Sequence, residues 1–196
     1  MLKMSLNHVT PSSQLTDEHF KAIGKIVAEW ANIESLLCIT LARLLLTPDF
    51  LGRSYTDRMS AARIQEAINE ALDLHIGRYC YDLISKHTID EITRINRRIT
   101  KLRSTRNKFA HFCWCRWDDE EIFGMHFSGG LPMTKKHQNS SIKLKISEIN
   151  SLYQEFYEIV EKLNQITYKL PEIDEKELFE NLARRVRKER QVREVI

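Results

Sequence analysis

The sequence is poor in the residues that mark several common classes of protein. Its 196 residues include only 6 Gly, 4 Pro and 4 Cys, and aromatic residues make up 9%. So few Gly and Pro favour helices. A content of 42% hydrophobic and 29% charged residues argues against general disorder, a fibrous repeat or a membrane bundle. Four scattered cysteines are too few for the disulfide framework of a small secreted domain. We therefore expect a helical protein in a reducing compartment.

Long hydrophobic runs and an excess of one charge are also missing. The most apolar stretch, 36–46, is interrupted by Thr40 and Arg43, and the amino terminus lacks the apolar core of a signal peptide. We expect a cytoplasmic protein that does not enter a membrane. Thirty Lys and Arg against 27 Asp and Glu leave a net charge of +3, so composition alone does not indicate nucleic-acid binding. Whether the chain could bind nucleic acid therefore depends on how its charges are distributed along the sequence.

The hydrophobic pattern predicts a mainly α fold with a small β-hairpin or three-strand excursion. A polar lead-in over 1–15 precedes the first helix. Apolar residues recur at helical spacing in five segments, and we expect helices over about 16–46, 56–74, 88–111, 147–170 and from 174 onward. Thr88 with Glu91 forms a capping box, and Ser147 is a further candidate cap. Aromatic and β-branched segments predict short strands at 112–117, 122–127 and 142–146.

Two charged residues occupy positions where their helices should present an apolar side chain. The apolar series that omits position 106 comprises Ile92, Ile95, Ile99, Leu102 and Phe109. The series that omits position 34 comprises Val27, Trp30 and Leu37. Because an unpaired charge in the core is costly, we predict that Glu34 and Arg106 meet between the two helices. They form a structural ion pair, or they extend to the surface, or Glu34 orients an arginine needed for chemistry.

The surroundings of Arg106 are polar and basic. Arg103, Asn107 and His111 follow one another at intervals of four residues, which places them on one helix face. Seven basic residues occur without an acidic one between them: Arg94, Arg97, Arg98, Lys101, Arg103, Arg106 and Lys108. Such a ridge attracts phosphate groups, although basic helix surfaces often serve only solubility.

A six-residue string at the end of the third predicted helix resembles the signature of a known family. The string consists of Arg106, Asn107, Lys108, Phe109, Ala110 and His111. It matches the R-N-x-x-A-H form of the R-x(4–6)-H signature of HEPN domains, the higher-eukaryote and prokaryote nucleotide-binding all-α domains. Trp30, Ile33 and Glu34 match the W-x-x-I-E pattern seen in many such proteins. The resemblance covers 16–170, with the β insertion at about 112–146 and a charged helix over 171–196 as additions.

The resemblance implies a four-helix up-down bundle that dimerises so that two such motifs face each other. Many HEPN proteins are metal-independent endoribonucleases of toxin, abortive-infection or CRISPR-associated systems, so RNA and an antitoxin or defence-system protein are the expected partners, and no cofactor is expected. His111 would move the proton of the ribose 2′-hydroxyl or of the leaving 5′-oxygen, Arg106 would hold the scissile phosphate, and Asn107 would assist. The expected products carry a 2′,3′-cyclic phosphate and a 5′-hydroxyl. The expected RNA-binding residues are Arg98, Lys101, Arg103 and Lys108.

Other interpretations stay open. A catalytically inactive HEPN module would bind RNA, nucleotide or a partner protein as a scaffold. A metal site would need His111, Cys113, Cys115 and His126 to converge, although their spacing is unlike that of common zinc modules.

Two further features have a structural and a functional interpretation. Trp114 and Trp117 either stack on bases or pack against a helix or partner. The last predicted helix is either a solvated cap or a basic arm that holds RNA or a partner chain. Its basic residues are Arg184, Arg185, Arg187, Lys188, Arg190 and Arg193. Its apolar edge consists of Leu178, Phe179, Leu182, Val186 and Val192.

Overall fold

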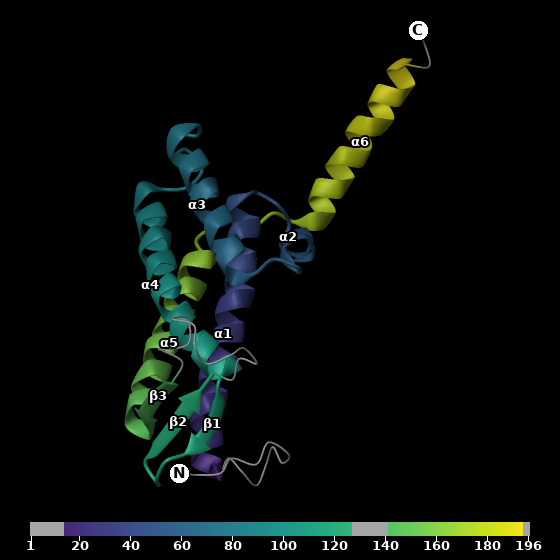
Figure 1. Cartoon of the computed structure of the whole chain (residues 1–196). Coiled ribbons are helices and arrows are strands. Elements are labelled where there is room, and N and C mark those ends of the chain that lie inside the picture. The colour runs from purple at the N-terminus through teal and green to yellow at the C-terminus, as the bar shows by residue number, and fades with distance from the viewer. Residues whose placement is uncertain (1–13, 127–140, 194–196) are drawn as a thin grey trace, which may run out of the picture. The chain divides into compact units, whose positions relative to one another are not determined.

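A computed structural model describes residues 14–126 and 141–193 (Figure 1). These residues are mainly helical, with 71% helix in six helices, and they include one three-stranded antiparallel sheet. The helices are α1 (Asp17–Leu44), α2 (Asp49–Thr56), α3 (Ala61–Gly77), α4 (Lys86–His111), α5 (Ile146–Thr167) and α6 (Glu175–Arg193). The strands are β1 (Cys113–Arg116), β2 (Glu121–Met125) and β3 (Ser141–Lys145). Most of the predicted polar lead-in lies outside the described residues.

The chain divides into two compact units. One consists of Met1–Ile33 and Ile95–Lys162, and the other of Glu34–Arg94 and Leu163–Ile196. The first unit therefore holds the sheet, the first half of α1 and most of α4 and α5. The second holds α2, α3 and α6 with the remaining parts of the long helices.

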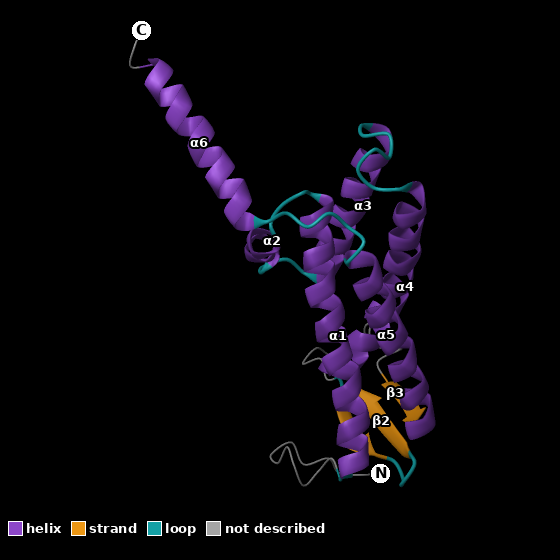
Figure 2. Ribbon diagram, turned by 180° about the vertical axis from the view of Figure 1, so that it is seen from behind, coloured by secondary structure: helices purple, strands orange, loops and turns teal. Residues whose placement is uncertain are grey.

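The sheet of the first unit is fixed to the end of α4 by Trp114. The predicted β excursion within 112–146 is a three-stranded sheet in the order β1-β2-β3 rather than a single hairpin, and Figure 2 shows the strands as one sheet. Trp114 stacks on Phe109 with ring centroids 5.2 Å apart, and its indole Nε1 donates to the Phe109 carbonyl at 3.3 Å. Gly124 lies opposite Trp114 in the register, where an added Cβ would come within 2.5 Å of the indole. Only glycine fits this position without displacing the ring.

The buried side of α1 differs by one residue from the predicted series. Val27, expected in the core, is 41% exposed, whereas Ile26 is fully buried. The buried residues of the helix are Ala22, Ile26, Trp30, Ile33, Leu37, Leu41, Ala42 and Leu44, with polar Thr40 and Arg43 also buried. Ile33 therefore fills the core position between Trp30 and Leu37. The inference that Glu34 interrupts the apolar series is wrong.

The predicted helix over 56–74 corresponds to α3, which starts at Ala61, and α2 lies before it, where no helix was predicted. Pro48 stands at the N-cap of α2, and Asp49 lies in the first turn of that helix. The proline therefore lies after the end of α1 and at the start of α2. A break follows, and the Ser60 hydroxyl caps α3 by accepting a hydrogen bond from the Arg63 backbone N–H at 3.3 Å. The expected start at about 56 is wrong, because the Ser60 cap starts α3 at Ala61, a position that apolar spacing does not reveal.

The caps of α4 and α5 also differ from those predicted. The Ser85 hydroxyl accepts from the Thr88 backbone N–H at 3.2 Å, so Ser85 is the cap and Thr88 is buried inside the helix. Glu91 instead forms an ion pair with Lys169 at 3.2 Å. At α5, the Glu148 carboxylate accepts from the Lys145 backbone N–H at 2.8 Å, and Ser147 lies within the helix.

A buried arginine connects three segments of the second unit. The Arg43 side chain is only 7% exposed; its guanidinium contacts Asp49 at 3.0 Å and Glu172 at 3.1 Å, and it donates to the Thr167 carbonyl at 3.1 Å. The hydrogen bond to Asp49 raises the pKa of Arg43, against the lowering effect of its burial. The Thr40 and Thr167 hydroxyls lie 2.8 Å apart beside it. This network joins α1, the start of α2 and the chain after α5.

No single described helix is long and apolar enough to cross a membrane. Among the described helices, α1 and α2 taken together as a bent pair reach the necessary length and apolar content. The four cysteines are free thiols.

Candidate functional site

The last turns of α4 bring most of the predicted site residues onto one helix of the first unit. The helix continues through His111, and its final turn is closed by a hydrogen bond of 2.9 Å from the Phe112 backbone N–H to the Lys108 carbonyl. Arg106 is half-buried, whereas Asn107 and His111 are exposed. A basic side chain that is partly withdrawn from water therefore precedes two accessible polar side chains in the last turns of the helix.

Arg106 lies against a buried aromatic ring. Its guanidinium carbon is 5.4 Å from the centroid of the Trp30 indole, within the range of a cation–π contact. Trp30 is 1% exposed and meets Phe156 edge-on at 6.1 Å, and its Nε1 has no hydrogen-bond partner among the described residues. Packing and the stacked cation thus define the position of this ring. Sequence reasoning identified Trp30 as a core residue and missed its contact with Arg106.

A hydrogen bond links the first two residues of the motif. Nη1 of Arg106 donates to the Asn107 side-chain oxygen at 3.3 Å. The ring of Trp30 and this amide together limit where the guanidinium points. Because a fixed planar guanidinium has several N–H donors in one plane, it suits bidentate contact with a phosphate or carboxylate.

The predicted RNA-binding residues differ in their surroundings. Lys101 is exposed, and Lys108, half-buried, follows it by seven residues, which places the two on the same side of α4. Arg103 is half-buried on another side. Arg98 lies 3.8 Å from Glu155 and 3.5 Å from Glu158 of α5. Two carboxylates already compensate the Arg98 charge, so it is the weakest of the four candidates for binding phosphate.

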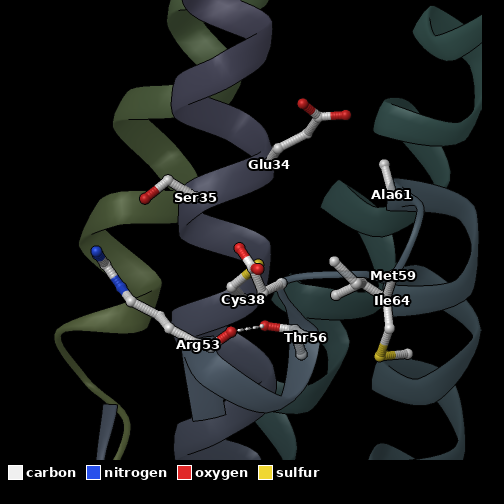
Figure 3. A pocket seen from close by; sticks show the side chains of 9 residues that line it. Glu34, Ser35, Cys38, Arg53, Thr56, Met59, Ala61 and Ile64 are labelled. Atoms are coloured by element: carbon white, nitrogen blue, oxygen red, sulfur yellow. Dashed lines mark hydrogen bonds between the residues drawn. The ribbon is translucent and has the colours of Figure 1, made fainter. Parts of the chain in front are cut away.

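Glu34 belongs to the second unit, and its predicted pairing with Arg106 stays a prediction. In that unit it lines a pocket of about 320 Å³ (Figure 3). The pocket is formed by Glu34, Ser35, Cys38, Arg53, Thr56, Asp57, Met59, Ala61 and Ile64. The Thr56 hydroxyl is bonded to the Gly52 and Arg53 carbonyls at 2.9 and 3.2 Å. No pattern in the sequence indicates this pocket, because its walls come from three helices and the links between them.

Compared with protein-family models, curated proteins and solved structures, the chain matches none. The resemblance to HEPN domains is therefore carried by the residues of the motif and by their position at the end of α4.

The alternative metal site does not form. In the described part of the chain, no group of three or more His, Cys, Asp or Glu is arranged to hold a metal ion, and His111, Cys113, Cys115 and His126 do not converge. Cys115 instead donates a weak hydrogen bond to the Phe123 carbonyl at 3.5 Å. Burial, and then the charge of Cys113, raises the pKa of the Cys115 thiol.

The two tryptophans next to the motif have different roles. Trp114 packs between α4 and the sheet, as one of its two interpretations expected. Trp117 is 61% exposed, with Lys143 Nζ 4.6 Å from its ring centroid. Four acidic residues follow it directly, Asp118, Asp119, Glu120 and Glu121. This acidic turn disfavours a phosphate backbone at Trp117, although the ring itself is accessible.

Proposed function

We propose that the protein is a HEPN-type, metal-independent endoribonuclease, in which His111 transfers the proton and Arg106 holds the scissile phosphate. The observation that carries the proposal is the fixed guanidinium of Arg106, stacked on Trp30 and bonded to Asn107, on the turn of α4 that leads to the exposed imidazole of His111. The pair combines a group that titrates near neutral pH with one that binds phosphate, and such a pair can cleave RNA through attack of the 2′-hydroxyl.

The proposed active form is a homodimer in which the α4 ends of two subunits face each other. Lys101, Arg103 and Lys108 would hold the RNA beside the motif. An antitoxin or another defence-system protein would restrain the activity.

The direct test is incubation of labelled RNA with the purified protein in EDTA. His111→Ala and Arg106→Ala should each lower the cleavage rate by about 10²–10⁴-fold, as expected for the loss of acid–base or charge-stabilising groups. His87→Ala is the matched control, because His87 lies on the same helix with its side chain 77% exposed and pairs with Glu91. A 2′-deoxy nucleotide at the cleaved position should block the reaction.

Equal cleavage by the wild type and both motif variants would overturn the proposal. An absence of cleavage, combined with RNA binding that depends on Arg106, would instead support the alternative of a catalytically inactive module. Light scattering tests the dimer, and a monomer at working concentration would contradict a composite site.

A further inference from the structure

Helix α6 exposes an apolar stripe that the proposed ribonuclease activity does not use. Phe179, Leu182 and Val186 are 49%, 44% and 45% exposed. With half-buried Leu178 they lie within about 100° of one another around the helix, because each residue turns the chain by about 100°. The other described side chains of α6 are mostly charged. A continuous apolar stripe on a charged helix is typical of a surface that another helix covers.

The two halves of α6 carry opposite charges. The first half contains Glu175, Glu177 and Glu180, and the second begins with Arg184, Arg185 and Arg187 and continues with further basic residues in the sequence. The apolar stripe crosses both halves. RNA is a poor occupant, because the acidic half that holds Leu178 and Phe179 repels phosphates. The occupant must instead present apolar side chains to the stripe, with basic residues beside the acidic half of α6 and acidic residues beside its basic half.

We propose that this occupant is α6 of a second copy of the chain, packed antiparallel. Antiparallel packing places each acidic half against a basic half and opposes the two helix dipoles, whereas parallel packing places like charges together. The centre of the stripe is Leu182, which would face Leu182 of the partner subunit across the two-fold axis. Phe179 would then contact the partner's Val186. The pair of Glu180 with Arg184, 3.5 Å apart within one helix, supports the helix itself.

Cysteine cross-linking of the full-length protein tests the orientation. Leu182→Cys should form a disulfide with its own copy under mild oxidation, because the two residues meet at the axis. Val186→Cys alone should not, but a mixture of Phe179→Cys and Val186→Cys proteins should cross-link. Peptide mapping by mass spectrometry separates these links from those of the native cysteines. Cross-linking of Val186→Cys to itself, or failure of either the Leu182→Cys or the mixed reaction, would overturn the proposal.

A second pair of variants tests the apolar contact. Leu182→Glu should lower the yield of the mixed cross-link by about tenfold or more, because it places two carboxylates at the axis. Asn181→Glu places a carboxylate at an exposed position about 140° or more from Phe179 and Val186 around α6, and should leave the yield unchanged. Equal yields from the two variants would contradict the stripe as the contact surface. Because the Leu182→Cys link should form equally well with His111→Ala, failure of the ribonuclease proposal is distinguishable from failure of this one.

Discussion

The guanidinium of Arg106 replaces an apolar side chain on the buried side of α4. Its neighbours at three-residue and four-residue spacing, Phe109 and Leu102, are 4% and 6% exposed. Stacking on Trp30 returns part of the electrostatic stabilisation that the charge loses on leaving water. An arginine can occupy this position because its flat, weakly hydrated head packs on a ring face, which a lysine ammonium does less well.

Trp30 should position Arg106 through its ring. We expect Trp30→Phe to keep most of the RNA-cleavage rate and Trp30→Leu to approach the rate of Arg106→Ala, measured in single turnovers. In an Arg106→Ala background, Trp30→Leu should lower the unfolding free energy without lowering cleavage further, because the two residues act through one contact. Additive losses of rate in the double variant would contradict this coupling.

Two glycines should respond to alanine in opposite ways. Gly124→Ala should lower the unfolding free energy by about 1–3 kcal/mol, because its Cβ would meet the Trp114 ring. Gly24 lies inside α1 with no atom within 4 Å of an added Cβ, so Gly24→Ala should raise it by about 0.5–1 kcal/mol. Urea denaturation measures both, and destabilisation by the Gly24 change would show that this site is not open.

The cysteines of β1 should differ in reactivity. Cys113 is exposed, whereas Cys115 is half-buried and burial raises the pKa of its thiol. A raised pKa means a smaller thiolate fraction near neutral pH, so iodoacetamide should modify Cys113 first and Cys115 slowly, with Cys115 gaining rate as the pH rises. Mass spectrometry of timed samples reports both rates. Equal rates at neutral pH would refute the difference in environment.

At the scale of elements, the connection of α1, α2 and the chain after α5 depends on Arg43. Asp49→Asn should lower the unfolding free energy by about 1–3 kcal/mol, because it removes the main partner of a buried cation. Glu172→Gln should change it by less than about 0.5 kcal/mol, because the Glu172 side chain is 68% exposed. Urea titration compares the two, and a larger effect of the Glu172 change would reverse this ranking of the partners.

Helices and strands were predictable where the signal is local. The three strands and the extent of α4 follow from aromatic, β-branched and apolar spacing within each segment. Helix α2 was missed because its eight residues are too few to show an apolar period, and the start of α3 was misplaced because apolar spacing does not reveal the Ser60 cap. On α1, the adjacent Ile26 and Val27 fit a helical stripe almost equally well. A stripe through Val27 places Glu34 in the core series, whereas the buried stripe through Ile26 places Ile33 there instead.

At the scale of the whole molecule, the net charge of +3 conceals local differences. The affinity of the His111→Ala variant for single-stranded RNA should fall as the salt concentration rises. In a plot of log affinity against log salt concentration, each phosphate contact should steepen the slope by about 0.7. Lys101→Ala should reduce that slope, whereas Arg98→Ala should leave it nearly unchanged, because Glu155 and Glu158 already compensate Arg98. Filter binding at several salt concentrations measures the slopes, and a larger effect of Arg98→Ala would reverse this assignment.

The sequence by itself determined the helical class, the small sheet and the placement of Asn107 and His111 at the end of a helix. These properties depend on spacing within one segment, which the order of residues contains. Only the tertiary structure decided that Arg106 stacks on Trp30, that Val27 faces solvent, and that the stripe of α6 stays uncovered within the described chain. Each of these depends on which distant segments pack together, and periodicity along the chain carries no information about that choice.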